Sequence, residues 1–296
     1  MRSARPLTKS LALLGVTTVA VALVSNAPAA VAKPGTANAA APTYAPADTA
    51  TIHPGTMMYT DGAQCTGNFV YTDGAGTTYV GYAAHCAGTG AATDTNGCDA
   101  QSLPLGTKVD FVEGGSLASS GTRVGGGTLV YSSWLTMQQK GESDADTCAY
   151  NDLALVKVDA ADVSKVNPSI PFWGGPVGVN TSGTAAGDSV YSYGNSSLRG
   201  GVEALSPKQG ASLGTEGGGW SHPVYTVSPG VPGDSGSAFL DAEGKALGVL
   251  STLAIAPLPA SNGVGDLNHE LTYAKANSGI SGLQLVPGTE PFSPLL

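Results

Sequence analysis

Short runs of alternating apolar and polar residues, separated by glycine-rich turns, extend from about residue 56 to residue 255. Such alternation is typical of β-strands that bury one face. The segment 71–80, YTDGAGTTYV, predicts a hairpin, because Asp73 and Gly74 form a turn dipeptide between two strand-like runs. The other runs that predict strands are GTKVDFVEGG, RVGGGTLVYSSWL, DLALVKV, DSVYSYGN, HPVYTV and SAFLDAEGKALGVLSTLAI.

A helical pattern is clear only near the C-terminus, in residues 266–280. There Leu267 and Leu271 share one face, and Gly279 can end the helix. Repeated short strands and 42 glycines favour an all-β barrel or sandwich over alternating strands and helices. The remaining length, about 230 residues, suits one all-β unit or two small barrels.

The first 32 residues have the order of a bacterial secretory signal peptide. Three basic residues precede the apolar run LALLGVTTVAVALV, and small residues then lead to Ala30-Val31-Ala32, a site of the cleavable type. The apolar run is too short to span a bilayer. Residues 33–55 are rich in Ala, Pro and Thr and predict a flexible leader or short pro-segment. We therefore expect a secreted, extracellular protein without a membrane partner once the signal is removed.

The charge of the chain narrows the range of partners. Loss of the signal, which holds three basic and no acidic residues, would change the formal net charge from -9 to -12. Nucleic acids and anionic lipids require clustered Lys and Arg. We therefore expect no nucleic acid partner.

Three segments carry residues suited to acyl transfer. GYAAHC places His85 at the end of an apolar strand, NDLALVKV places Asp152 before another, and PGDSGS places Ser235 in a glycine-rich turn. A serine attacks a carbonyl when a histidine takes its proton and an aspartate orients the imidazole. The N–H groups of Gly233 and Ser235 are candidates for an oxyanion hole, because little side-chain bulk surrounds them. Each residue alone is a weak signal, and their combination predicts a catalytic triad.

The segments AAHC, NDLALV and GDSGS resemble the three catalytic segments of the chymotrypsin-like (trypsin-fold) serine peptidases, especially their secreted bacterial branch. The resemblance extends from about Cys65 to Leu253. It implies an all-β fold of two six-stranded antiparallel β-barrels with the active site in the cleft between them. His85 and Asp152 would come from the first barrel and Ser235 from the second.

The resemblance also implies a domain organisation. The peptidase domain is expected over residues 56–283, with its two barrels divided near residues 160–185. A short C-terminal helix would close it, and residues 284–296 would form a tail. We expect protein or peptide substrates, no cofactor and a monomer.

The four cysteines are an even number in an exported chain, which favours two disulfides over a metal site. No paired C-x-x-C or His spacing suggests zinc. Three pairings are possible in principle. The resemblance implies a bridge between Cys65 and Cys86, which leaves Cys98 and Cys148 for the second.

Part of the substrate cleft is also implied by the resemblance. The segment ALGVLSTLA resembles the family strand that pairs with the substrate, which places Ser251, Thr252 and Leu253 beside the primary specificity pocket. Ser251 would also lie near the Asp152 carboxylate. Trypsin-type members carry an aspartate six residues before the nucleophile, where this chain has Pro229. Cleavage after Lys or Arg is therefore disfavoured, and Leu253 predicts a narrow pocket for small or medium uncharged residues.

One departure from the family concerns the residue before the nucleophile. The chain lacks the Ile-Val-Gly-Gly type of N-terminus, whose free amine pairs with that aspartate. Asp234 therefore needs another cation, because an unpaired buried carboxylate is costly. Arg199 is the candidate and Arg123 the reserve. The histidines outside the three segments are expected at the surface or in loops: His53, His222 and His269.

The serious alternative is a secreted binding protein on the same scaffold that has lost its peptidase activity. Such proteins usually carry a substituted triad, whereas this chain keeps all three triad residues and Gly233. An α/β-hydrolase would require the order Ser, Asp, His, which the chain lacks. We therefore expect a serine endopeptidase that acts through an acyl-enzyme.

Overall fold

The computed structural model describes residues 42–91, 95–253 and 259–294. The predicted signal peptide and residues 33–41 of the predicted leader lie outside these residues. Within the described ranges, no helix is long and apolar enough to cross a membrane.

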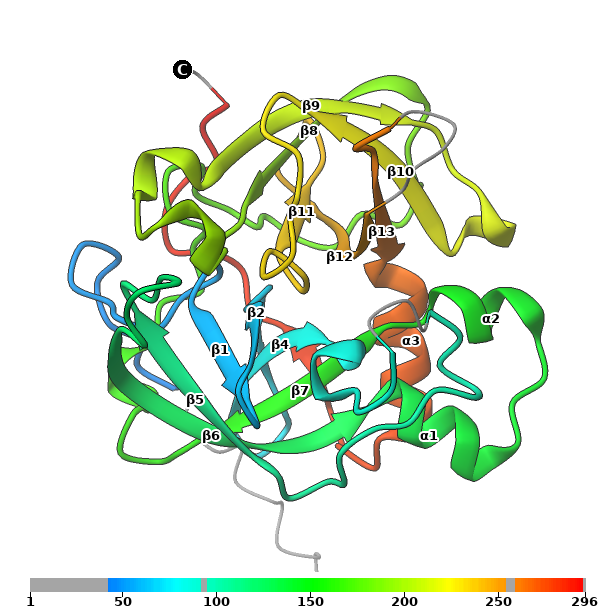
Figure 1. Ribbon diagram of the computed structural model, residues 1–296, viewed down its shortest axis with the longest axis horizontal. Coiled ribbons are helices and arrows are strands. Elements are labelled where there is room, and N and C mark those ends of the chain that lie inside the picture. The colour runs from blue at the N-terminus through cyan, green and yellow to red at the C-terminus, as the bar shows by residue number, and fades with distance from the viewer. Residues whose placement is uncertain (1–41, 92–94, 254–258, 295–296) are drawn as a thin grey trace, which may run out of the picture. The chain divides into compact units, whose positions relative to one another are not determined.

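Two antiparallel β-sheets form the framework of the described chain (Figure 1). The first sheet has the strand order β14-β3-β4-β7-β6-β5-β1-β2. Irregular pairing of the long strand β6 with both neighbours curves this sheet. Its strands are β1 (Met57–Thr60), β2 (Ala63–Thr66), β3 (Val70–Thr72), β4 (Thr78–Ala83), β5 (Lys108–Glu113), β6 (Thr122–Ser132), β7 (Leu153–Val158) and β14 (Gln284–Leu285).

The second sheet is a closed six-stranded barrel in the order β10-β13-β12-β11-β8-β9, in which β9 also pairs with β10. Its strands are β8 (Ala186–Tyr193), β9 (Pro207–Leu213), β10 (Ser221–Thr226), β11 (Ala238–Leu240), β12 (Ala246–Leu253) and β13 (Asn262–Asp266). The predicted all-β fold class is confirmed. The first sheet differs in having eight strands where six were expected, because the short strands β2 and β14 extend its two edges.

Burial explains why the central strands of both sheets are apolar. Every residue of β4 is buried, and in β7 only Lys157 is exposed. A separate apolar core fills the second barrel: Val190, Val224, Phe239, Leu247, Leu250 and Val264. The predicted catalytic residues His85 and Asp152 directly follow β4 and precede β7, so these buried strands hold them in place.

Among the described residues three α-helices accompany the sheets, of which only α3 (Leu267–Asn277) was expected. The other two, α1 (Ser133–Lys140) and α2 (Ala145–Tyr150), precede the Asp152 segment. The strand-like run RVGGGTLVYSSWL thus changes to helix at Ser132, whose hydroxyl accepts the Leu135 N–H.

The folded part of the chain begins before residue 56 and extends beyond residue 283, the limits that the sequence predicted for the peptidase domain. Ile52, placed in the predicted leader, is fully buried and bridges to Val166. At the other end, β14 pairs with β3, and the Phe292 ring lies 5.4 Å from that of Tyr191. Parts of the predicted leader and tail are therefore held by strand pairing and apolar contacts.

Candidate active site

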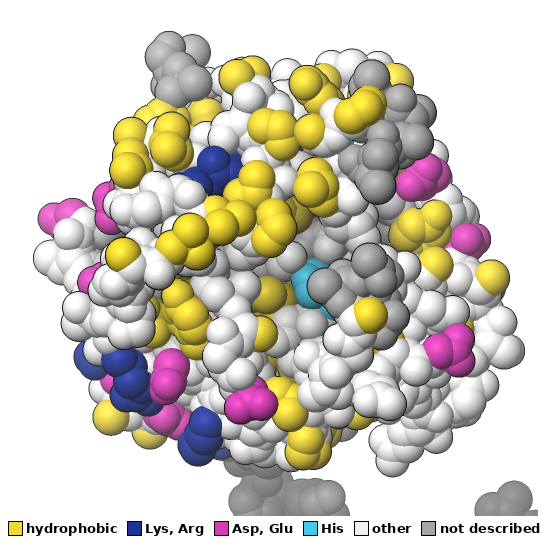
Figure 2. Space-filling model, in the orientation of Figure 1, with side chains coloured by type: hydrophobic (Ala, Val, Ile, Leu, Met, Phe, Trp, Pro, Cys, Tyr) yellow, Lys and Arg dark blue, Asp and Glu magenta, His cyan; other side chains and the backbone are white. Residues whose placement is uncertain are grey.

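A cleft of about 560 Å³ is lined by residues of both sheets. A histidine side chain (cyan) is visible near the middle of the face shown in Figure 2. Of the predicted substrate-binding residues, Pro229 does not line this cleft, and its carbonyl accepts a hydrogen bond from Arg199 Nη2 at 3.0 Å. The predicted site residues that do line it are Cys65, His85, Cys86, Asp152, Gly233, Ser235, Ser251, Thr252 and Leu253.

His85 lies in a short 3-10 helix, Ala84–Ala87, directly after the buried strand β4. Its Nδ1 atom lies 2.6 Å from Asp152 Oδ2, and its backbone N–H donates to Asp152 Oδ1 at 2.8 Å. A ring whose Nδ1 is held by a carboxylate leaves Nε2 available to accept a proton. The structure thus joins two of the three predicted triad residues by direct hydrogen bonds.

Asp152 immediately precedes β7 and is almost completely buried. Ser251 Oγ donates to Asp152 Oδ2 at 2.6 Å, which confirms the predicted proximity of these residues. Partial burial of the ring lowers the pKa of His85, but the charge and hydrogen bond of Asp152 raise it, and its net pKa lies above the usual value. The carboxylate therefore favours the protonated imidazole.

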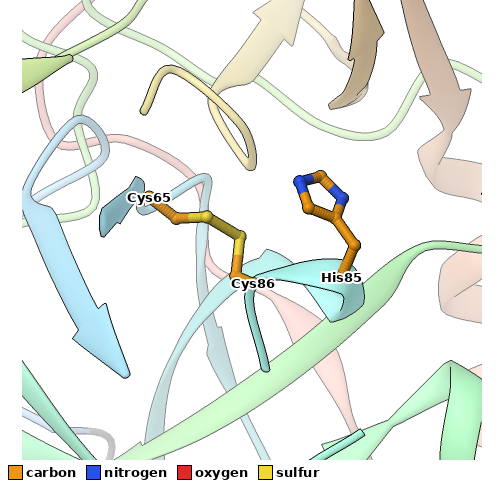
Figure 3. Close-up of side chains that lie close together, drawn as sticks. All are labelled: Cys65, His85 and Cys86. Carbon is orange, nitrogen blue, oxygen red and sulfur yellow. A yellow bond between two sulfur atoms is a disulfide. The ribbon is translucent and has the colours of Figure 1, made fainter. Parts of the chain in front are cut away.

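The two disulfides of the described chain are Cys65–Cys86 and Cys98–Cys148, the pairings that the resemblance implies. Cys65–Cys86 ties β2 to the His85 helix, as Figure 3 shows. The two sulfur atoms and a His85 ring nitrogen lie within 4.8 Å of one another. The sulfurs are bonded to each other and so offer no thiolate to a metal ion.

Ser235 lies in the turn before β11 and lines the same cleft as His85. Its carbonyl accepts the Thr66 N–H at 2.8 Å, and the next N–H, of Gly236, donates to Leu250 O at 2.7 Å. Within the described chain, Ser235 Oγ makes no hydrogen bond with the His85 ring. Such contacts are often loose without substrate and shorten when it binds.

The turn also offers two free backbone donors. Neither the Gly233 N–H nor the Ser235 N–H donates a hydrogen bond to any group in the described part of the chain. Gly233 has a φ of +97°, which favours glycine. Two unpaired N–H groups beside a serine are the arrangement that an oxyanion requires.

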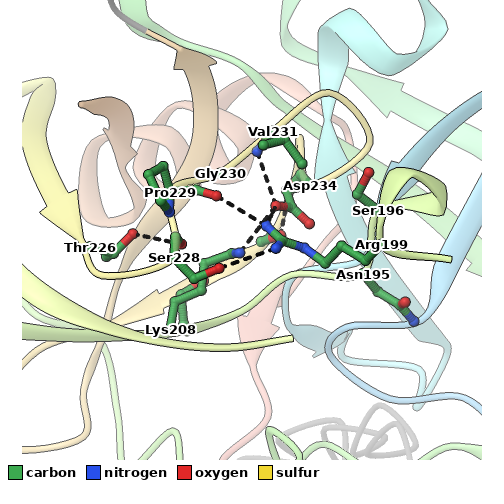
Figure 4. A network of polar contacts seen from close by, with 12 residues as sticks. Asn195, Ser196, Arg199, Lys208, Thr226, Ser228, Pro229, Gly230, Val231 and Asp234 are labelled. Atoms are coloured by element: carbon green, nitrogen blue, oxygen red, sulfur yellow. Dashed lines mark hydrogen bonds and ion pairs between the residues drawn. The ribbon is translucent and has the colours of Figure 1, made fainter. Parts of the chain in front are cut away.

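Asp234 is fully buried and pairs with two cations, which Figure 4 shows. Arg199 Nη2 lies 2.6 Å from its Oδ2, so the predicted partner is confirmed. Lys208 Nζ lies 3.1 Å from the same oxygen, a partner that the sequence did not suggest. Burial lowers the pKa of Lys208, and Asp234 counteracts this. The reserve candidate, Arg123, instead pairs with the exposed Asp110.

Replacement of Arg199 by methionine is expected to lower the free energy of unfolding by about 3 kcal/mol, because it removes one partner of a buried ion pair. Turnover should fall about tenfold, since Asp234 is adjacent to Ser235. The matched control is Arg123→Met, which breaks an exposed pair and should cost less than about 1 kcal/mol. Urea unfolding and peptide hydrolysis measure both effects. Undiminished turnover and stability in Arg199→Met would contradict the assigned role.

A buried acid behind the triad is a further residue that the sequence did not reveal. Glu270 of α3 is fully buried, and its Oε1 accepts the Asp152 N–H at 2.9 Å. Its Oε2 has no hydrogen-bond partner among the residues that the structure describes. Burial raises the pKa of Glu270 well above its usual value, the Asp152 N–H lowers it, and the charges of Asp152 and Asp266 raise it. Glu270 thus holds the backbone of Asp152, a predicted triad residue.

The raised pKa of Glu270 predicts a pH-dependent stability. Between the unfolded pKa, about 4.5, and the folded pKa, the folded state holds one more proton, so stability falls as pH rises. Glu270→Gln keeps an oxygen that can accept the Asp152 N–H but has no titrating proton. Relative to wild type, the variant should therefore gain up to about 1.4 kcal/mol per pH unit above pH 4.5. Urea unfolding at several pH values measures the difference, and a difference independent of pH would contradict the prediction.

The other histidines differ from expectation in one case. His222 is fully buried rather than exposed, and its Nε2 lies 2.8 Å from Asp266 Oδ2. The second oxygen of Asp266 lies 2.7 Å from His269 Nδ1. His269 and His53 are partly exposed, as expected. His222 therefore helps to hold the N-terminus of α3, which Asp266 caps.

Comparison with known proteins finds solved structures that are similar to this one. No family model matches the chain, and no curated protein sequence matches it. Protease A of Thermobifida fusca is 19% identical and covers 80% of this chain and 99% of its own, with a TM-score of 0.49.

Two further solved structures are similar. A Nocardiopsis protease is 17% identical, covering 79% of this chain and 98% of its own, with a TM-score of 0.45. A chymotrypsin of Cellulomonas bogoriensis is 17% identical, covering 80% of this chain and 98% of its own, with a TM-score of 0.44.

Proposed function

We propose that the chain is a secreted serine endopeptidase that uses His85, Asp152 and Ser235. One observation carries the proposal: a hydrogen-bonded Asp152–His85 pair, a serine and two unpaired N–H groups meet in one cleft. A binding protein has no need of this combination. All the groups named in this observation belong to one chain, which supports action as a monomer.

The reaction follows from the roles of these groups. Ser235 Oγ attacks the carbonyl carbon of the scissile peptide while His85 Nε2 takes its proton, and Asp152 stabilises the resulting imidazolium. The N–H groups of Gly233 and Ser235 bind the oxyanion. The C–N bond then breaks, and His85 gives its proton to the leaving amine. Water attacks the acyl-enzyme in the same way and releases Ser235.

The cleft favours an uncharged side chain before the scissile bond. Among the described residues that line it, Asp152 is the one carboxylate, and His85 and Ser251 already engage it. No lysine or arginine lines the cleft there. A substrate cation or carboxylate would therefore lose its hydration without gaining a partner.

Asn262 lies in the wall of the cleft. Its side chain is almost fully buried, and its amide accepts from the Gly230 N–H at 2.8 Å and donates to Thr252 O at 3.3 Å. The amide thus links the two backbone segments that line this part of the cleft. We propose that this bridge restricts the preferred residue to small uncharged side chains.

Replacement of Asn262 by glycine should open the pocket. We expect kcat/KM for substrates with Leu or Phe before the scissile bond to rise about tenfold relative to Ala, because a buried aliphatic or aromatic side chain gains about 1.5–3 kcal/mol. The measurement is hydrolysis of fluorogenic peptides that differ at this one position. An unchanged ratio of Phe to Ala would show that Asn262 does not set the preference.

Export is supported by the sequence and by the cysteines. The N-terminal segment has the order of a signal peptide, and two disulfides are typical of oxidising compartments. We propose that the protein acts outside the cell on proteins or peptides.

The proposed activity is tested by incubating the mature protein with a peptide library and identifying the cleaved bonds by mass spectrometry. We expect internal cleavage after small uncharged residues, and no cleavage with Ser235→Ala prepared in the same way. Folded wild-type protein that leaves every peptide intact would contradict the proposal. Equal cleavage by the variant would point to a contaminating peptidase.

A further inference from the structure

The proposed oxyanion donor Gly233 belongs to a tight turn. The Asp234 N–H donates to Val231 O at 2.8 Å, which closes a four-residue turn with Pro232 and Gly233 at its centre. The φ of Gly233, +97°, after a proline identifies a type II turn. Types I and II differ by about half a rotation of the middle peptide. The turn type therefore decides whether the Gly233 N–H or the Pro232 carbonyl faces the reacting carbonyl.

Ser196 holds the carbonyl of this middle peptide. Its hydroxyl donates to Pro232 O at 2.6 Å and accepts the Leu198 N–H at 3.1 Å. Ser196 is fully buried and does not line the cleft. The C=O and N–H of a trans peptide point in opposite directions. A carbonyl bound to Ser196 therefore leaves the Gly233 N–H directed away from Ser196.

Two side chains of β2, in the other sheet, hold the next peptide. Gln64 Nε2 donates to Gly233 O at 3.0 Å, and Thr66 Oγ1 donates to the same oxygen at 2.7 Å. A Cβ atom on residue 233 would collide with Gln64 Oε1 and lie 2.9 Å from Ser196 Oγ. The peptides on both sides of Gly233 are thus held by side chains that approach from outside the turn.

We propose that Ser196, Gln64 and Thr66 are positioning residues for the oxyanion hole. They hold the peptides on either side of Gly233 so that its N–H is directed at the developing oxyanion. In the other orientation the Pro232 carbonyl would face that negative charge and repel it. The inference rests on the proposed peptidase function, and the three side chains act through the backbone of the turn. Ser196 and Thr66 do not line the cleft, whereas Gln64 does.

The test compares Ser196→Ala with wild type in peptide hydrolysis. We expect kcat to fall about 10- to 100-fold, because loss of an oxyanion donor costs about 10²- to 10³-fold and here the donor is misdirected rather than removed. KM should change less than about twofold. The Ki of a peptide aldehyde, which forms a tetrahedral adduct with Ser235, should rise in parallel with the fall in kcat/KM. Ser196→Thr, which keeps the hydroxyl, should restore most of the activity.

The matched control is Ser212→Ala, which removes another buried serine of the same barrel that bonds to nearby backbone. Its kcat should stay within about twofold of wild type. Ser196 also caps the 3-10 helix Ser197–Arg199, so a second variant is needed. Thr66→Val removes a donor to Gly233 O from the other sheet and should lower kcat about tenfold.

Two outcomes would overturn the inference while leaving the peptidase function intact. One is an active wild type with unchanged kcat in Ser196→Ala and Thr66→Val. The other is a lowered kcat without a parallel rise in the aldehyde Ki, which would indicate general loosening of the fold. Failure of the wild type itself to hydrolyse peptides would instead contradict the proposed function.

Discussion

Replacement of Ser235 by alanine is expected to lower kcat about 10⁶-fold and leave substrate binding almost unchanged. The variant loses the attacking oxygen, while the cleft, the His85–Asp152 pair and both free N–H groups remain. Activity is measured as peptide hydrolysis at saturating substrate, and fluorescence titration with a slowly cleaved peptide measures binding. Ser212→Ala serves as a control for loss of a serine from the same barrel.

A fall in activity of less than about tenfold in Ser235→Ala would contradict the nucleophile assignment. Residual activity of about 10³-fold over the uncatalysed rate would agree with it, because bound substrate still meets the oxyanion donors.

Replacement of Asp152 by asparagine is expected to lower kcat/KM about 10⁴-fold near neutral pH. The Asp152 carboxylate receives hydrogen bonds from the His85 backbone and from Ser251, and its Oδ2 lies 2.6 Å from His85 Nδ1. An asparagine can turn an N–H group toward Nδ1, which favours the wrong imidazole tautomer. The matched control is Asp110→Asn, whose parent carboxylate is exposed and pairs with Arg123.

The pH profile tests the same pair. Wild-type kcat/KM should rise with pH through an apparent pKa above 6.5, because Asp152 raises the pKa of His85 and only the neutral ring accepts a proton. In Asp152→Asn the charge that raises this pKa is gone, so the acid limb should shift to lower pH. An acid limb at the same pH in both proteins would contradict the coupling.

The parts of the site that could be predicted are residues whose immediate neighbours in the sequence form a recognisable pattern. His85 and Asp152 flank apolar strands and Ser235 lies among glycines, so each could be located without the fold. The need of Asp234 for a cation followed from the cost of burying a charge, and Arg199 satisfies it at 2.6 Å. Strand alternation likewise predicted the all-β class.

The residues that sequence reasoning missed are recruited from far along the chain. Glu270 contacts Asp152 across 118 positions, and Gln64 contacts Gly233 across 169. A buried lysine such as Lys208 looks like any surface lysine in an alternating strand. Their roles depend on the juxtaposition of the two sheets, which no local pattern contains.

Helices α1 and α2 were missed for a different reason. The run leading into α1 favours a strand, and the change to helix occurs at Ser132, which caps the first turn. At the other end, Gly141 has a φ of +65° and ends the helix. Both signals are present in the sequence, but each helix is too short for its apolar positions to show a period.

The most direct test of the triad is active-site labelling. Mature wild-type protein is incubated with diisopropyl phosphorofluoridate, and the adduct is located by mass spectrometry of its peptides. The proposed triad predicts one adduct per chain on Ser235, formed faster as pH rises through the pKa of His85, and none on folded Ser235→Ala. Folded wild-type protein without an adduct, or an adduct that persists in Ser235→Ala, would contradict it.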